Sequence, residues 1–341
     1  MRSLDDTMAG MRAAAEPTRL RILALCADGD LTVSELVRIL GQSQPRVSRH
    51  LKVLTAAGLL ARVPEGSWVF HRLAQDGAQT DLAARLVDLA PLDDETLAQD
   101  RERLVQIKRE RAEAAAEYFR ENADRWDELR SLHVDDAVVE KKILDLVPER
   151  VERHLDLGTG TGRVLELLAD RTEFGQGIDM SHEMLSVARA NLDARGLTHC
   201  QVRQADITQP PFASESFDLV TVHQVLHYLA DPDRAIEAAS RMLRPGGTLL
   251  VVDFAPHEEE NLRRNHQHRR LGFSDAEAEA WLKAAGLTPR AIHHLAGDPL
   301  TVTLWAADKT AARNADPEPT TPPLARPDAG AEAGRTLETT P

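Results

Sequence analysis

The segment 154–162 reads H-L-D-L-G-T-G-T-G and combines an acid with three alternating glycines. Glycines lack a Cβ atom, so this backbone can turn sharply and approach a ligand closely. The apolar run after Arg163 predicts a helix, whose first N–H groups would face the same ligand. A dinucleotide site requires G-x-G-x-x-G, and its third glycine would fall at Arg163. The acid before the glycines, Asp156, instead suits a ligand with a cationic group and no pyrophosphate.

Further acids follow the next predicted strands. Asp179 ends the segment G-I-D around residue 178, and Asp206 follows the predicted strand at 200–203. A fourth apolar strand over 217–222 ends at His223. A single glycine loop is explained by a tight turn without any ligand, but four such elements in order, with acids at strand ends, favour a binding site.

This order of motifs resembles that of the class I S-adenosylmethionine (SAM) methyltransferases. The resemblance implies an α/β protein with a Rossmann-like sheet and helices on both of its faces. It also implies SAM or S-adenosylhomocysteine (SAH) as the ligand, with Asp179 on the ribose hydroxyls and Asp206 with Ile207 on the adenine. The cofactor-binding residues implied in this way are Asp156, Gly158, Thr159, Gly160, Gly162, Asp179, Met180, Asp206, Ile207 and His223.

The net charge differs between the two ends of the chain. The 341 residues carry −14 at pH 7, which argues against a nucleic-acid binder. Residues 1–75 nevertheless carry +3, which leaves −17 on the remainder. A basic module on an acidic body is the charge asymmetry expected of a protein with a separate DNA-binding part.

Within the basic module, the sequence predicts a helix from Pro17, a second over 31–40 that Gly41 ends, and a third over 43–54 with Ser43 as N-cap. One face of the third helix is apolar, and its outward face suits a DNA major groove. The candidate base- and phosphate-contacting residues of this helix are Gln44, Arg46, Ser48, Arg49, His50 and Lys52. Taken alone, the helix is explained equally well by a solvated basic face.

Two alternating segments, 58–63 and 67–73, predict a β-hairpin after this helix. A helix-turn-helix followed by a hairpin is a winged helix, and Arg62 and Arg72 are the candidate DNA contacts of its wing. The words E-P-T-R-L-R-I-L, S-Q-P-R-V-S-R-H-L-K-V-L and A-G-L-L resemble the arsenic-repressor (ArsR/SmtB) family over residues 12–90. The resemblance implies a homodimer that binds an inverted repeat in double-stranded operator DNA.

Metal sensing is not expected of this chain. The metal-sensing members of the resembled family carry paired cysteines before the turn, where this chain has L-T-V-S-E at 31–35. Without thiolates there, a soft-metal site is excluded. The two cysteines, Cys26 and Cys200, are far apart in apolar surroundings, which fits a reducing cytosol. No apolar run of about 18 residues exists, so we expect a cytoplasmic protein without a membrane segment.

Composition divides the chain into four segments. They are a winged-helix DNA-binding and dimerisation domain over 1–92, a helical linker and lid over 93–150, a SAM-binding domain over 151–308 and a disordered tail over 309–341. A charge-laced helix that starts at residue 93 or 94 and runs towards Tyr118 is expected to be a spacer, because it has few apolar residues. Tyr118 and Trp126 are candidates for a lid over the cofactor, although aromatic residues on a helix are more often plain packing residues.

The whole chain resembles bacterial proteins in which an ArsR-type winged helix is fused to a methyltransferase fold. Some of these are thought to sense SAH and to control the methionine cycle, and the fold alone does not establish catalysis. The sequence thus predicts a transcriptional regulator, a repressor with SAM or SAH as effector. The alternative is an active methyltransferase with a small-molecule acceptor, so whether the chain is an enzyme stays open.

An acceptor site is less defined than the nucleoside site. His223-Gln224 replaces the Asn/Asp-Pro-Pro-Tyr motif of amine methyltransferases, and the thiol cluster that arsenite methylation needs is absent. A general base could come from one of several histidines, each of which is equally well explained as a surface or core residue. These are His223, His227, His257, His266 and His268.

Overall fold

The computed structural model describes residues 3–65, 68–74, 78–91, 94–121, 134–266 and 268–310. The lid prediction at Trp126, and the predicted tail beyond residue 310, lie outside these ranges. No helix in the described ranges combines the length and the apolarity that a membrane crossing requires.

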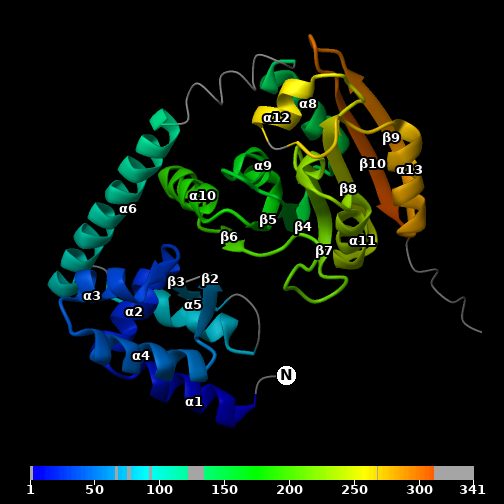
Figure 1. Ribbon diagram of the computed structural model, residues 1–341. Helices are drawn as coiled ribbons and strands as arrows, with labels where there is room; N and C mark the ends of the chain where they lie inside the picture. The colour runs from blue at the N-terminus through cyan, green and yellow to red at the C-terminus, as the bar shows by residue number, and fades with distance from the viewer. Residues whose placement is uncertain are drawn as a thin grey trace, which may run out of the picture. The chain divides into compact units, whose positions relative to one another are not determined.

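The N-terminal part is a helical module with a small antiparallel sheet of order β1-β3-β2 (Figure 1). Its elements are α1 (Leu4–Ala14), α2 (Pro17–Ala27), β1 (Leu31–Thr32), α3 (Val33–Leu40), α4 (Gln44–Ala56), β2 (Leu60–Glu65), β3 (Trp68–Leu73) and α5 (Thr80–Asp88). The helix-turn-helix and the hairpin are therefore where the sequence predicts them.

Local chemistry explains most of these boundaries. Pro17 occupies the first turn of α2, and Gly41 ends α3 with a φ of 63°, a conformation that glycine adopts without strain. Residues 31–32 form a strand rather than a helical turn, because Thr32 and Glu35 build a capping box that starts α3 at Val33. Ser43 takes the N-cap position of α4 but makes no capping hydrogen bond through its side chain.

The long helix α6 (Glu95–Glu121) is not a spacer along its first half. Leu104 and Ile107 are buried in the core of the N-terminal module. The Arg21 guanidinium pairs with buried Asp100 at 2.6 Å, and Arg111 pairs with Glu35 at 2.8 Å. The expectation of a spacer was wrong. Three or four apolar residues at helical spacing are enough to pack a helix against a core when the charged residues beside them form ion pairs.

The second part is a seven-stranded sheet of order β6-β5-β4-β7-β8-β10-β9. Its elements are α8 (Asp136–Leu146), β4 (Val151–Leu157), α9 (Arg163–Leu168), η1 (Ala169–Arg171), β5 (Thr172–Asp179), α10 (His182–Ala194), β6 (Cys200–Gln204), β7 (Phe217–His223), η2 (Leu226–Tyr228), α11 (Pro232–Met242), β8 (Leu243–Phe254), α12 (Glu260–Asn265), α13 (Asp275–Ala284), β9 (Leu287–Leu295) and β10 (Val302–Lys309).

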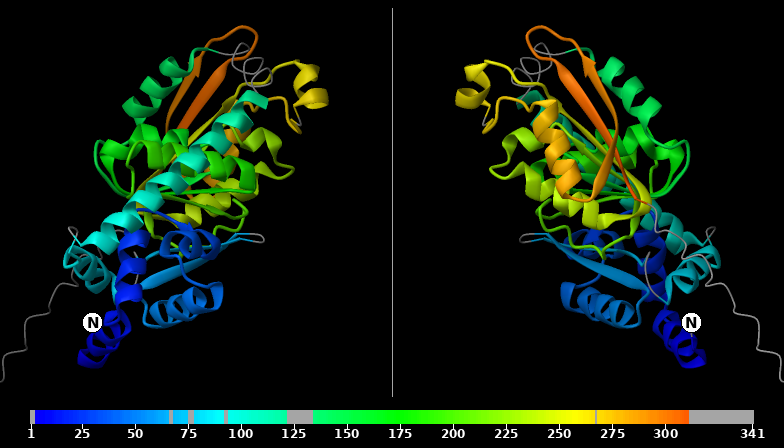
Figure 2. Two further views of the ribbon diagram at one scale, coloured as in Figure 1. Left: turned by 90° about the vertical axis from the view of Figure 1, so that its left-hand side faces the viewer. Right: turned by 90° about the vertical axis from the view of Figure 1, so that its right-hand side faces the viewer.

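Five neighbouring strands, from β6 to β8, are parallel, and β10 pairs antiparallel with both β8 and β9. One face of the sheet packs against α11 and α13, and the other packs against α8, α9 and α10. Figure 2 shows β9 and β10 as the long orange hairpin that ends the sheet. This confirms the expected Rossmann-like sheet with helices on both faces.

Candidate nucleoside site and DNA interface

The glycine loop after β4 is folded against β5. The backbone N–H groups of Gly158 and Thr159 both donate to the Ile178 carbonyl, at 2.8 and 2.9 Å. Gly158, Gly160 and Gly162 have positive φ values of 75°, 51° and 82°. A Cβ at Gly158 would lie 2.6 Å from the Val225 side chain, whereas one at Gly160 would meet open space. The loop therefore needs glycine at 158 to close against the end of β7, and at 160 for its left-handed backbone.

Asp179 at the end of β5 ties this loop to the next helix. One carboxylate oxygen accepts from the Gly160 N–H and the other from the Ser181 N–H, each at 2.9 Å. The side chain of Ser181 caps α10. The carboxylate is thereby oriented before any ligand arrives.

The remaining predicted adenosine contacts lie nearby at the same sheet edge. Asp206, just beyond β6, is exposed and accepts from the backbone and hydroxyl of Thr208, both at 2.8 Å. Met180 is 62% exposed, and Ile207 is buried in the hydrophobic core. Parallel strands end at one edge of their sheet, and that edge is where ligands of such folds bind.

Asp156 is different from the other acids because it is buried. The Thr221 hydroxyl donates to its Oδ1 at 2.6 Å and accepts from the His154 imidazole at 2.8 Å. Burial raises the pKa of Asp156 to about 6 and lowers that of His154 to about 3. Asp156 Oδ2 has no hydrogen-bond partner among the described residues, so a cationic ligand group would satisfy a carboxylate that the fold leaves short of donors.

The residue that follows β7, Gln224, has an unusual backbone conformation. Gln224 has a φ of 50°, and its N–H donates to the Val252 carbonyl at 2.7 Å. A non-glycine residue with a positive φ has a strained backbone and is often found at a functional site. Its neighbour His223, a predicted cofactor contact, is half-buried at the strand end. Backbone strain has no signature in residue type, so sequence reasoning could not find it.

Several of the candidate histidines lie together beyond β7 and β8. His227 and His268 stack with ring centroids 4.0 Å apart, and the Phe254 ring lies 5.3 Å from that of His227. Buried Asp253 accepts from His227 Nδ1 at 2.7 Å. In the described ranges, no group of three or more His, Cys, Asp or Glu residues is arranged to hold a metal ion.

The outward face of α4 is available to DNA in this structure. Gln44, Arg46, Ser48, Arg49 and Lys52 are exposed, whereas Val47, Leu51 and Leu54 are buried in the core. His50 is half-buried, with its ring 3.5 Å from the Glu16 carboxylate. The pKa of His50 is lowered, chiefly by burial. This residue is therefore at the margin of the candidate face.

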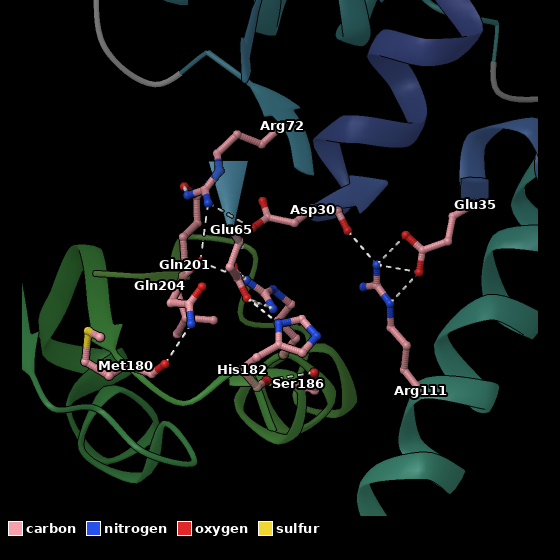
Figure 3. A network of polar contacts seen from close by, with 12 residues as sticks. Asp30, Glu35, Glu65, Arg72, Arg111, Met180, His182, Ser186, Gln201 and Gln204 are labelled. Carbon is pink, nitrogen blue, oxygen red and sulfur yellow. Dashed lines mark hydrogen bonds and ion pairs between the residues drawn. The ribbon is translucent and has the colours of Figure 1, made fainter. Parts of the chain in front are cut away.

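On the wing, Arg62 is exposed but Arg72 is not. The Arg72 side chain is 7% exposed and pairs with Asp30 at 2.9 Å. It also donates to the Gln201 side chain and to the Val202 carbonyl of β6 (Figure 3). The predicted DNA contact of Arg72 is therefore not available in this structure, because the alternation along β3 turns its side chain towards β6.

Comparison with known proteins agrees with this division of the chain. Residues 155–251 match the family described as "Methyltransferase domain", and residues 16–62 match "Bacterial regulatory protein, arsR family". A ubiquinone biosynthesis O-methyltransferase of Pseudomonas fluorescens is 30% identical over 52% of this chain and 82% of its own length. The chain belongs to the methyltransferase family. It also carries an arsR-family helix-turn-helix.

Two further proteins are similar to parts of this methyltransferase-family chain. A demethylmenaquinone methyltransferase of Thermus thermophilus is 36% identical, and the match covers 40% of this chain and 64% of that protein, less than two thirds. The solved structure of YcgJ from Bacillus subtilis is 20% identical, with a TM-score of 0.46 over 51% of this chain and 98% of that one. The fold assignment accordingly rests on strand order and the family match, and the methyltransferase match supports SAM or SAH as the ligand.

Proposed function

We propose that this chain is an arsR-type transcriptional regulator whose methyltransferase domain binds SAM or SAH as effector. The arsR-family match and the exposed polar face of α4 support DNA binding. The acids at the ends of β4, β5 and β6 support nucleoside binding. On this proposal the protein is a cytoplasmic homodimer that represses genes by binding an inverted repeat, and methionine-cycle genes are the first targets to test.

The observation that carries the proposal is a buried ion pair between the wing and the helix that follows the ribose-binding acid. Glu65 at the end of β2 has a fully buried side chain and pairs with Arg189 of α10. The same carboxylate lies 3.0 Å from Nδ1 of His182, the first residue of α10 (Figure 3). His182 is three residues beyond Asp179, so the loop that receives the ribose also bonds the wing.

Further contacts make this a continuous interface. The Arg189 guanidinium lies over the Phe70 ring of β3 at 4.0 Å, and the Trp68 ring stacks on His182 with centroids 5.6 Å apart. Helix α6 adds Lys108, 3.1 Å from Asp193 of α10. The backbone carbonyl of Met180 accepts from Gln204 at 2.7 Å, which joins the adenosine loop to β6.

Burial makes this interface sensitive to small displacements. Removing one partner of a buried ion pair costs about 3–5 kcal/mol, since the other charge is left unpaired. A shift of the loop at residues 179–182 on nucleoside binding would therefore alter the free energy of the wing contact. An effector changes DNA affinity only when it binds one of two protein states more tightly, and this contact is a candidate for the difference between the states.

SAM and SAH need not have the same effect on the contact between the wing and α10. They differ by a methyl group and a positive charge, and Asp156 is a buried carboxylate that would sense that charge. We expect the effective ligand to change operator affinity with a coupling of about 1–3 kcal/mol. By thermodynamic linkage, operator DNA must change the affinity for that ligand by the same factor.

The experiment begins with selection of the operator from random double-stranded DNA. Fluorescence anisotropy then measures operator affinity with no ligand, with SAM and with SAH, and calorimetry measures ligand affinity with and without operator. Matching factors from the two titrations support the regulator. Operator affinity that is indifferent to both bound ligands refutes the effector role.

A second candidate function, a small-molecule methyltransferase, is favoured by a separate observation. The relatives include proteins named for O-methylation in ubiquinone biosynthesis. In this chain, the sheet edge at the ends of β7 and β8 also holds the buried Asp253–His227 pair.

A further inference from the structure

Asp253 and His227 form a pair that the nucleoside site does not use. Asp253 is the second-last residue of β8 and is fully buried. Its carboxylate accepts from the Leu226 N–H at 3.0 Å, the Phe254 N–H at 2.8 Å and His227 Nδ1 at 2.7 Å. Three donors hold the carboxylate in place, so it remains an acceptor and fixes the proton of His227 on Nδ1.

The opposite nitrogen of His227 is consequently a proton acceptor. None of the described residues forms a hydrogen bond with Nε2. The ring is held between His268, stacked at 4.0 Å, and Tyr228, tilted at 4.2 Å. The backbone N–H groups of Arg269 and Arg270 fix the His227 carbonyl at 2.9 and 3.2 Å. A histidine with its tautomer set by a carboxylate and its ring clamped is the arrangement of an activated general base.

The pair lies beside the nucleoside loop on the other side of β4. Val225, two residues before His227, is the side chain that a Cβ at Gly158 would meet. Strand order places β5 and β6 on one side of β4, and β7 and β8 on the other. A ligand with its nucleoside over β5 and β6 leaves the edge at β7 and β8 for a second molecule, at the point where the strand order reverses.

The charges of the neighbouring groups, His257, His268 and Asp253, indicate which type of second molecule would bind here. Burial lowers the pKa of His268 to about 3 and that of His257 below its usual value, so both are neutral at pH 7. Neutral imidazoles give a carboxylate or phosphate no counter-charge, and the three donors on Asp253 leave no free carboxylate for an ammonium group. His268 Nδ1 and His257 Nε2 are buried without hydrogen-bond partners among the described residues. They suit a neutral polar molecule, and the surrounding rings suit an aromatic one.

We propose that His227, positioned by Asp253, is the general base of an O-methyl transfer to a phenol-type acceptor. The phenol oxygen attacks the methyl carbon of the sulfonium, so an O–C bond forms as the C–S bond breaks. The electron pair of that bond stays on sulfur, which leaves neutral SAH. The phenol proton passes to His227 Nε2 and then to water. This inference rests on the SAM-binding part of the proposed function and not on the DNA-binding part.

The test uses the full-length protein with catechol, benzoate and benzylamine as matched probes of a phenol, a carboxylate and an amine. Calorimetry with SAM and SAH is done first on every variant, because intact binding shows an intact fold. Transfer of the labelled methyl group from SAM is then measured for each probe. Catechol is expected to be the accepted probe, with a 10²–10⁴-fold fall in kcat for His227→Gln, the range typical of a lost general base.

Three further measurements separate a base from a structural residue. Asp253→Asn must place an amide N–H against either the Leu226 N–H or His227 Nδ1, so it is expected to lower kcat with little change in KM. Added imidazole is expected to restore part of the activity of His227→Ala. His294→Gln, an exposed histidine on β9, serves as the matched control with unchanged kcat.

The outcomes are distinct. Wild-type protein that binds SAM but transfers no methyl group to catechol overturns the inference, as does preferred transfer to benzoate or benzylamine. Equal activity of His227→Gln and wild type, or no imidazole rescue of a SAM-binding His227→Ala, also overturns it. Failure of the wild type to bind either nucleoside refutes the proposed function itself.

Discussion

Replacement of Asp156 by asparagine probes the cost of keeping a buried carboxylate for a cationic ligand. Burial raises its pKa from 3.8 to about 6, which corresponds to about 3 kcal/mol between its two protonation states. A raised folded-state pKa contributes stability that is fully present below pH 3.8 and is lost as the pH rises through 6. The ligand-free protein is therefore destabilised by its own Asp156 at neutral pH.

The magnitude follows from the two pKa values. At pH 5 the folded carboxyl is mostly protonated, and the linkage relation gives about 1.4 kcal/mol more stability than at pH 7.5 from this group. Asparagine removes the titration and keeps an oxygen for the Thr221 hydroxyl. The unfolding free energy of Asp156→Asn minus that of wild type should thus rise by about 1.4 kcal/mol between pH 5 and pH 7.5.

Urea unfolding of the ligand-free proteins at the two pH values measures this difference. Asp206→Asn is the matched control, because that acid is exposed on the same sheet edge. SAM affinity of the wild type should fall about tenfold from pH 7.5 to pH 5, as the proton competes for Asp156. A stability difference that is the same at both pH values would refute the assignment of a buried carboxylate with a raised pKa, whatever the variant does to SAM binding.

Three further predictions address the sites separately. Asp179→Asn should raise the Kd of both SAM and SAH at least tenfold by calorimetry, because one of its two backbone N–H donors then faces an amide; native affinity would contradict the ribose assignment. Arg46→Ala should lower the ratio of operator to random-DNA affinity by about 1–3 kcal/mol, whereas Arg62→Ala should weaken both alike and reduce the salt slope by about one; identical behaviour would refute the division into helix and wing roles. Glu65→Gln should retain SAM binding but lose most of the ligand dependence of operator affinity in anisotropy titrations; unchanged ligand dependence would exclude the wing contact as the coupling element.

Sequence alone predicts the parts of this chain in which local chemistry decides the structure. In the glycine loop, a Cβ would clash or φ is positive at several positions. Such positions require glycine, so the residue type itself reveals them. The caps at Pro17, Gly41 and Ser181 are similarly local. Apolar strands with acids at their ends were enough to predict the sheet edge at which Asp156, Asp179 and Asp206 lie.

What the sequence could not predict depends on contacts between distant segments. Arg72 is 129 residues from Gln201, and Glu65 is 124 residues from Arg189. A charged residue on a wing is typical of a phosphate contact, and nothing in its neighbours shows that β6 and α10 accept it instead. Asp253 was missed for the same reason, because its role appears only once η2 brings His227 to the end of β8.

The burial of Arg72 also limits how the wing can take part in DNA binding. In this structure Glu65, Phe70 and Arg72 are occupied by α10 and β6, so Arg62 is the exposed basic residue that the described part of the wing offers. Phosphate contacts supply much of the affinity for DNA, and each lost contact also lowers its salt dependence. A state with the wing released would separate Arg72 from Gln201 and Val202, although not from Asp30, and would leave Arg189 without its carboxylate. On the proposed function, DNA and α10 would therefore compete for the wing. The loop at 179–182 is bonded to the wing only when the wing lies on α10, so a ligand bound at this loop would act on one of the two states, as the proposed ligand-controlled repressor requires.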